Sequence, residues 1–198
     1  MKRAAAAILC LGVLLLAFLC DGVIDQWVAT HRSAEWELAA KMCSRYSAWP
    51  WLMLSAALAL LAAWLRGRRD WLRVVCAMMI AASLAGLAAD LLRGVTGRTR
   101  PYAPVRQGFY GVHDGSRWLI TKHAYNAFPS GHTAAITGFL VPLVLRWRRV
   151  ALAALPMIAL VGAARVYVGA HHPSDIVAGA LLGCLIALAV WRRVQARA

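Results

Sequence analysis

The sequence lacks the features by which disulfide-rich and zinc-binding domains are recognised. It has no Cys-x-x-Cys pair, and its cysteines are odd in number: Cys10, Cys20, Cys43, Cys76 and Cys184. Four of them lie inside apolar runs, where a thiol usually serves as a small buried hydrophobic group. We therefore predict neither a disulfide framework nor a metal site. Internal repeats and low-complexity tracts are also missing, apart from an Ala/Leu bias.

Acidic residues are few as well: eight Asp and Glu stand against 22 Lys and Arg, which gives a formal net charge of +14. Such a charge fits either nucleic acid or an anionic surface, and the positions of the bases decide between them. Hydrophobic residues make up 62% of the 198 residues, well above the roughly 45–50% of a soluble domain. The bases lie between the apolar runs. The composition predicts a single-domain integral membrane protein over residues 1–198.

Six apolar runs each approach the roughly 17–25 residues that cross a bilayer as a helix. They cover residues 4–20, 48–65, 74–92, 132–145, 150–168 and 174–191. The fourth run is short and Arg165 interrupts the fifth, so the polar end of either helix should face a protein-lined cavity. The predicted fold class is all-α, an integral membrane six-helix bundle.

The first run follows Lys2 and Arg3 and resembles a secretory signal. Leu19 is bulky at a position where cleavage requires a small residue, so we expect this helix to be retained, with cleavage as the alternative. The following segment, 21–47, mixes Trp27 and Trp36 with charges. It is predicted to be an amphipathic helix lying on the outer membrane surface.

The basic loops give an orientation, because Lys and Arg near the ends of spans stay in the cytoplasm. With the N-terminus inside, one face carries twelve bases and one acid, and the other carries ten bases and seven acids. We predict a multi-pass protein of the cytoplasmic (inner) membrane with the N- and C-termini both cytoplasmic. Attraction to anionic lipid explains the basic excess, so no nucleic-acid partner is expected.

The connection 93–131 is unlike the others, because it is rich in Gly and Pro and carries polar residues. Loops longer than about 12–15 residues are usually functional or disordered. We interpret this one as functional, since three polar clusters lie within it or on the same extracytoplasmic side. The clusters are Arg93 with Arg100-Pro101, then Pro129-Ser130-Gly131-His132, then Arg165 with His171 and Asp175.

The first cluster pairs Arg93 with Arg100. The two arginines are seven residues apart, nearly two helical turns, so both can hold one phosphate. Gly94 and Gly97 weaken the helical assumption, although a loop can present the same pair.

The second cluster comes directly before an apolar run. Free backbone N–H groups at a helix start make an anion site, Gly131 allows close approach, and the Ser130 hydroxyl adds a donor. A plain serine N-cap is the alternative. His132 would lie in the first turn, beside the bound anion.

In the third cluster the chain must turn between Arg165 and His171, because six residues on a helix would point them to different faces. Gly169 can supply the bend. Asp175 would then hold the His171 ring in the tautomer that exposes a nucleophilic nitrogen. His172 is the competing candidate, one residue closer to Asp175.

These clusters resemble the type 2 phosphatidic acid phosphatase (PAP2) superfamily, whose signature is Lys-x6-Arg-Pro, Pro-Ser-Gly-His and Ser-Arg-x5-His-x3-Asp. The motifs span 93–175, under half of the chain, and the six-span pattern around them also fits. Two positions depart from the signature. Arg93 replaces Lys, which keeps the charge but changes its geometry, and Ala164 replaces Ser, which removes one hydroxyl contact.

The resemblance implies a metal-independent lipid phosphate phosphatase with no cofactor and a helical core in the last four spans. His171, oriented by Asp175, would attack phosphorus and form a phosphohistidine. His132 would act as general acid and then as general base. The phosphoryl group would be held by Arg93, Arg100, Ser130, Gly131 and Arg165.

The motifs leave the substrate and the acceptor open. Undecaprenyl diphosphate, phosphatidylglycerol phosphate, phosphatidic acid and lipid A all present a phosphate on a membrane lipid. A phosphotransferase of the same family, a vanadate haloperoxidase and a non-catalytic lipid binder or transporter are the alternatives. The sequence carries no signal for the oligomeric state.

Overall fold

Seven α-helices make up the described part of the chain in a computed structural model, which describes residues 2–120 and 122–196. They are α1 (Lys2–Thr30), α2 (Ala34–Tyr46), α3 (Trp49–Leu65), α4 (Arg69–Thr96), α5 (Gly131–Arg146), α6 (Ala151–Tyr167) and α7 (Pro173–Ala196). Two 3-10 turns, η1 (His123–Tyr125) and η2 (Arg148–Val150), complete the order. The all-α fold class is confirmed.

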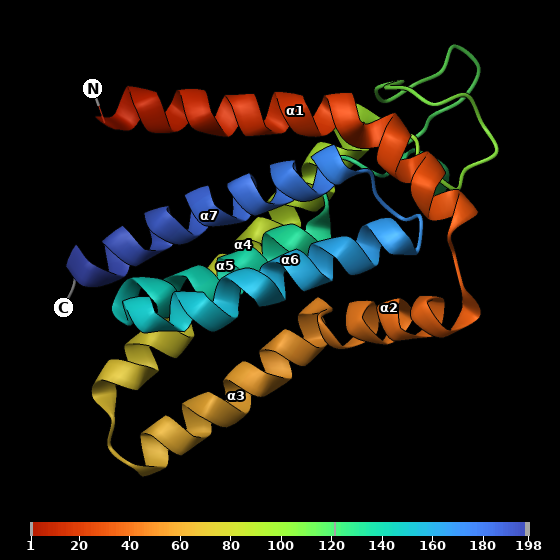
Figure 1. Ribbon diagram of the computed structural model, residues 1–198. Coiled ribbons are helices and arrows are strands. Elements are labelled where there is room, and N and C mark those ends of the chain that lie inside the picture. Colours follow the sequence, from red (N-terminus) through yellow and green to blue (C-terminus); the bar gives the residue numbers. More distant parts are fainter. Residues whose placement is uncertain (1, 121, 197–198) are drawn as a thin grey trace.

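The helices pack side by side: α4, α5 and α7 pack against one another, and α6 packs against α5 (Figure 1). The start of α1 and the end of α7 lie at one end of the bundle, together with the turns α3–α4 and α5–α6 (Figure 1). The long connection 97–130 lies at the opposite end (Figure 1). The basic stretches predicted to be cytoplasmic therefore share one end, away from the polar clusters. Which end faces the cytoplasm stays a prediction.

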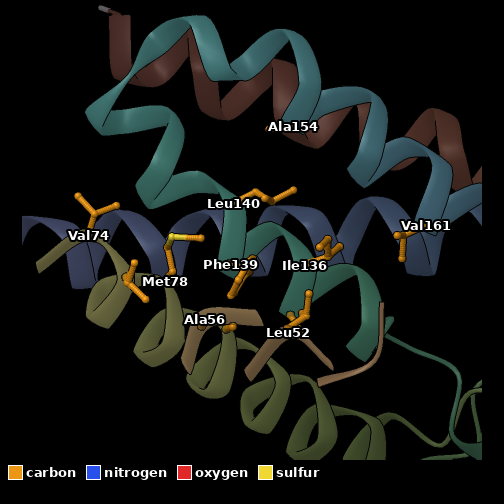
Figure 2. Packing of buried hydrophobic residues seen from close by; sticks show 12 residues of the cluster. Leu52, Ala56, Val74, Met78, Ile136, Phe139, Leu140, Ala154 and Val161 are labelled. Carbon is orange, nitrogen blue, oxygen red and sulfur yellow. The ribbon is translucent and has the colours of Figure 1, made fainter. Parts of the chain in front are cut away.

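A core of buried hydrophobic side chains joins α3, α4, α5 and α6 (Figure 2). Its labelled members are Leu52, Ala56, Val74, Met78, Ile136, Phe139, Leu140, Ala154 and Val161. Small residues let the central helices approach closely, as is common for helices in membranes. A Cβ on Gly183 of α7 would overlap the carbonyl oxygen of Ala134 in α5, and one on Gly138 would lie 2.7 Å from the carbonyl oxygen of Ala81 in α4. The backbone that carries the start of α5 is thus fixed on two sides.

Four helices in the searched ranges 2–120 and 122–196 are long and apolar enough to cross a membrane: α1, α4, α6 with η2, and α7. The helices α2 and α3 form a fifth candidate, a pair bent by 53°. The helix α5 has only 16 residues, about 24 Å at 1.5 Å per residue, and its sides are largely buried in the bundle. The six-span count therefore stays a prediction.

The segment 21–47 differs from the single amphipathic helix that we predicted. Residues up to Thr30 continue α1, and only 34–46 form a separate helix, α2, capped by the Ser33 side chain. No proline interrupts the chain between residues 20 and 30, so the apolar helix simply extends. The prediction was wrong for 21–30, and the extension carries two carboxylates, Asp21 and Asp25, toward the polar clusters.

The connection 97–130 is held by backbone hydrogen bonds although it has little regular structure. Gly97 adopts a left-handed conformation (φ 57°) that ends α4, where a side chain would overlap Gly111. The Arg100 N–H donates to the Ala124 carbonyl at 2.8 Å. The connection thereby turns back over the bundle and places Arg100 beside the helix ends.

Substituting Gly183 tests the close packing of α5 and α7. Gly183→Ala should lower the free energy of unfolding by about 1–3 kcal/mol, because the added methyl group collides with the α5 backbone. Thermal unfolding in detergent measures the effect. The matched control is Gly12→Ala in α1, where a Cβ meets no atom within 4 Å. Equal stability of the two variants would contradict the packing.

Candidate active site

Helix ends bring the three polar clusters together at one end of the bundle. Arg93 lies in the last turn of α4 and Arg165 in the last turn of α6. His132 lies in the first turn of α5, and Asp175 in the first turn of α7. Gly169, with φ of 71°, makes the predicted bend between α6 and α7. The helix ends explain why residues distant in sequence share one site.

Three arginines, Arg93, Arg100 and Arg165, line the site. Each has a buried Nε without a hydrogen-bond partner within the described residues. Arg93 contacts the Asp90 carboxylate and lies against Gly131, while Arg100 donates through Nη2 to the Asn126 carbonyl at 3.1 Å. Burial lowers the pKa of Arg100, and the charge of Asp175 opposes that effect. Converging guanidinium groups with unused donors are suited to a tetrahedral oxyanion.

His171 is fully buried and its two ring nitrogens differ in environment. Nδ1 lies 2.8 Å from the Ala127 carbonyl oxygen and 3.5 Å from Asp175 Oδ2, and both atoms are acceptors. Nδ1 therefore carries the proton, which leaves the lone pair on Nε2. Nε2 is buried and has no hydrogen-bond partner in the part of the chain that the structure describes. The arrangement gives a neutral ring with one free basic nitrogen.

Asp175 holds this ring less directly than the spacing suggested, since the nearer acceptor is the Ala127 carbonyl. One Asp175 oxygen, Oδ2, also accepts the backbone N–H of His172 at 2.8 Å. Its other oxygen, Oδ1, accepts from Arg98 Nη1 at 2.5 Å. Asp175 is therefore a fixed acceptor beside His171, and the carbonyl supplies the shorter bond.

His172, the competing candidate, has both ring nitrogens occupied. Nδ1 lies 2.5 Å from Asp25 Oδ2 and Nε2 lies 3.0 Å from the Thr99 carbonyl oxygen. Both partners are acceptors, so the ring is an imidazolium. Burial lowers the pKa of His172, but the hydrogen bond to Asp25 together with the negative charges of Asp175 and Asp25 outweighs it, so the pKa is raised above its usual value. A cationic ring without a free lone pair is no nucleophile, and the geometry favours His171.

Ser130 and Gly131 lie at the start of α5, and one part of the anion-site prediction needs correction. The Ser130 N–H donates to the Asp175 carbonyl at 2.9 Å, so this amide is not available to a phosphate. The Ser130 hydroxyl caps α5 by accepting from the Thr133 N–H at 3.4 Å. The capping alternative is thus correct for this hydroxyl. The first-turn N–H groups of Gly131 and His132 remain directed out of the helix start.

His132 borders two cavities. One, of about 380 Å³, is lined by Arg93, Gly131 and His132 together with Trp49, Leu87 and other residues of α3, α4 and α5. The other, of about 400 Å³, adjoins His132 and Arg165 and reaches the basic residues of α2. A group bound by the arginines therefore has His132 beside it and space on both sides.

Sequence reasoning missed the residues that bind Asp175, His172 and one another on the side of the site away from the arginines. They are Asp21, Asp25, Arg98 and Ser174. Arg98 lies in the gap of the first motif and is 7% exposed. The signal that could have found Asp21 and Asp25 is their presence in an apolar helix, where a carboxylate is costly without a partner.

The sequence profile of the PAP2 superfamily, which covers phosphatases of this motif pattern, matches residues 71–198. The matched region contains all three motifs and more than half of the chain. The chain belongs to the PAP2 superfamily. The resemblance stated from the motifs is confirmed.

Three similar proteins illustrate this PAP2 membership. Lipid A 1-phosphatase of Rhizobium etli is 34% identical over 103 residues, 50% of this chain and 41% of that protein. Bacitracin transport permease protein BcrC of Bacillus licheniformis is 31% identical over 144 residues, 71% of this chain and 66% of that protein. The PAP2 type phosphatidylglycerolphosphate phosphatase of Bacillus subtilis superposes with a TM-score of 0.69 at 20% identity, covering 99% of this chain and 98% of that chain. This PAP2 chain thus spans less than half of the first relative's length, and the superposition shows the fold of a membrane protein.

The pKa values of the two adjacent histidines should be shifted in opposite directions. Burial lowers the pKa of His171 to about 4, so its ring should stay neutral until the pH falls through about 4. His172 should stay charged above pH 6.5. We expect a nitrogen-15 NMR titration of the detergent-solubilised protein, assigned by loss of signal in His171→Asn, to give this order. A higher midpoint for His171 than for His172 would contradict the environments described.

Proposed function

We propose that the protein is a lipid phosphate phosphatase that works without a metal through a phosphohistidine intermediate. The observation that carries the proposal is the free Nε2 of His171, buried in a site lined by three arginines with unused donors. A nucleophile beside a cationic cluster is the arrangement needed for phosphoryl transfer. The phosphatases among its relatives support placing it with the phosphoric ester hydrolases.

In the first step, Nε2 of His171 attacks phosphorus while Arg93, Arg100 and Arg165 neutralise the equatorial oxygens. The P–O bond to the lipid breaks, and His132 donates a proton to the leaving oxygen. The Ala127 carbonyl and Asp175 stabilise the positive charge that develops on the His171 ring.

In the second step, His132 takes a proton from water, whose oxygen attacks the phosphohistidine. The P–N bond breaks and returns the electron pair to Nε2 of His171. Inorganic phosphate leaves, and the net reaction adds one water across the phosphoester.

A phosphorylated membrane lipid is the proposed substrate class. The site lies at the ends of apolar helices, and the cavity of about 380 Å³ next to it is lined by apolar residues of α3, α4 and α5. Lipid A 1-phosphatase and the phosphatidylglycerolphosphate phosphatase act on lipids according to their names. Undecaprenyl diphosphate and phosphatidic acid complete the set to be assayed.

The proposed location is the cytoplasmic membrane, with the site facing away from the cytoplasm. The clustering of the basic turns at the other end of the bundle supports this orientation.

Removal of the proposed nucleophile gives the direct test. We expect His171→Ala to lose phosphate release by at least about 10³-fold, on the order seen when a catalytic nucleophile is removed. A phosphorus-labelled substrate should leave acid-labile label on the His171 side chain of the wild-type protein. The exposed His31→Ala serves as control and should keep wild-type activity. Label on His172 would contradict the assignment.

The role of the arginines predicts that activity survives chelation. Exhaustive treatment with a chelator should leave kcat unchanged, because guanidinium groups supply the positive charge that a metal provides elsewhere. The measurement is phosphate release before and after treatment. Loss of activity that Mg²⁺ restores would show that the arginines do not suffice.

A further inference from the structure

Two carboxylates of α1, Asp21 and Asp25, reach the turn between α6 and α7. They are four residues apart, so they project from one face of α1 about one turn apart. Both precede residues 71–198, the part of the chain that matches the family profile. The reaction steps above use neither of them.

Asp21 binds the start of α7 and Arg98 at once. Its Oδ2 accepts from Arg98 Nη2 at 2.5 Å and from the Ser174 hydroxyl at 2.6 Å, and its Oδ1 accepts the Ser174 N–H at 2.8 Å. Arg98 Nη1 donates to Asp175 Oδ1 at 2.5 Å. The guanidinium group of Arg98 therefore bridges a carboxylate of α1 and the carboxylate beside His171.

Packing fixes this bridge. The Arg98 guanidinium carbon lies 5.0 Å from the ring centre of Phe18, 4.9 Å from that of Phe109 and 5.8 Å from that of Phe128. Such contacts stabilise a cation and exclude water. Because Phe18 also comes from α1, this helix supplies both a carboxylate and part of the aromatic enclosure.

Asp25 makes a second, separate contact with the same turn. Its Oδ2 lies 2.5 Å from Nδ1 of His172, whose Nε2 is bound by the Thr99 carbonyl at 3.0 Å. His172 adjoins His171 in the chain, so this ion pair fixes the backbone next to the proposed nucleophile.

We propose that α1 is a working part of the active site, in which Asp21 and Asp25 are positioning residues for the Asp175–His171 pair. The inference rests on the proposed function and adds to it. Asp21 acts through Arg98 on Asp175. Without the Asp21 charge, Arg98 pairs with Asp175 alone and draws that carboxylate away from His171. The arginines that hold phosphate are untouched, so the chemical step suffers and substrate binding does not.

A double-mutant cycle separates this positioning role from simple stabilisation. We expect Asp21→Asn to lower kcat about 10- to 100-fold with little change in KM, the size typical for an outer hydrogen-bond partner. Because Asp21 acts through Asp175, the double variant with Asp175→Asn should lose no more than Asp175→Asn alone. Independent losses that multiply, or an unchanged kcat in Asp21→Asn, would overturn the proposal.

Two controls accompany the cycle. Asp70→Asn removes a carboxylate that pairs with Arg146 at 3.6 Å at the other end of α4, and it should keep wild-type activity. Val161→Ala destabilises the core and should lower the melting temperature without the loss in kcat. A similar loss of kcat in Val161→Ala would assign the Asp21 effect to stability and overturn the positioning role.

Vanadate binding gives a readout that does not need turnover. If the wild type releases no phosphate from any lipid, the proposed function fails, and thermal-shift titration with vanadate still tests the role of α1. Vanadate adopts the trigonal bipyramidal geometry of phosphoryl transfer and bonds to the nucleophile, so its affinity follows the position of the His171 ring, whereas KM for the lipid does not. Asp21→Asn should therefore bind vanadate at least about 10-fold more weakly than the wild type and Asp70→Asn. Equal affinities, or no binding by any of them, would overturn the inference.

Discussion

The rest of the structure depends on one constraint: several positive charges are held close together in a buried pocket. Arg93, Arg100 and Arg165 line one site, and each keeps a buried Nε that has no hydrogen-bond partner among the described residues. Such a cluster is stable only where the fold holds it in place, because each charge would gain by moving into water. It is also the arrangement that an oxyanion relieves. In the proposed function, this crowding of positive charge is the source of the affinity for phosphate.

The scaffold meets this constraint with rigid packing on one side and charge balance on the other. Glycines let α5 lie against α4 and α7, which fixes the helix start beside Arg93. Behind His171, Arg98 binds a carboxylate of α1 on one side and the Asp175 carboxylate on the other. The carboxylate near the His171 ring is therefore fixed in place. The anion pocket therefore carries excess positive charge, whereas the charged residues behind it are paired with residues of opposite charge. In the proposed reaction, this separation would let the pocket take up a phosphate without disturbing the His171 ring.

Much of the site could be predicted from sequence because its residues lie at helix ends marked by local signals. Local signals mark these ends: a turn or a helix start is specified by each of Gly169, Pro173 and the Ser130 cap. They place the motif residues at the ends of the helices. The sequence also indicated the all-α class through long apolar runs. The six-span count stays a prediction, because α5 has only 16 residues and a helix buried in a bundle needs no full membrane length.

The partners of the supporting residues were beyond prediction because they are distant in sequence. Asp21 meets Ser174 across 153 positions, and Asp25 meets His172 across 147. No local spacing encodes such pairs. The distinction between His171 and His172 had the same origin, since the nitrogens are told apart by Ala127, Thr99 and Asp25. The tertiary structure supplies these neighbours, and with them the reason why one histidine keeps a free lone pair.

An experimental structure of the protein with bound vanadate tests the central claim most directly, because vanadate adopts the trigonal bipyramidal geometry of phosphoryl transfer. The account predicts a vanadium bond to Nε2 of His171, with Arg93, Arg100 and Arg165 on the equatorial oxygens and His132 near the apical oxygen opposite. Vanadate bonded to His172, or bound away from the three arginines, would contradict it.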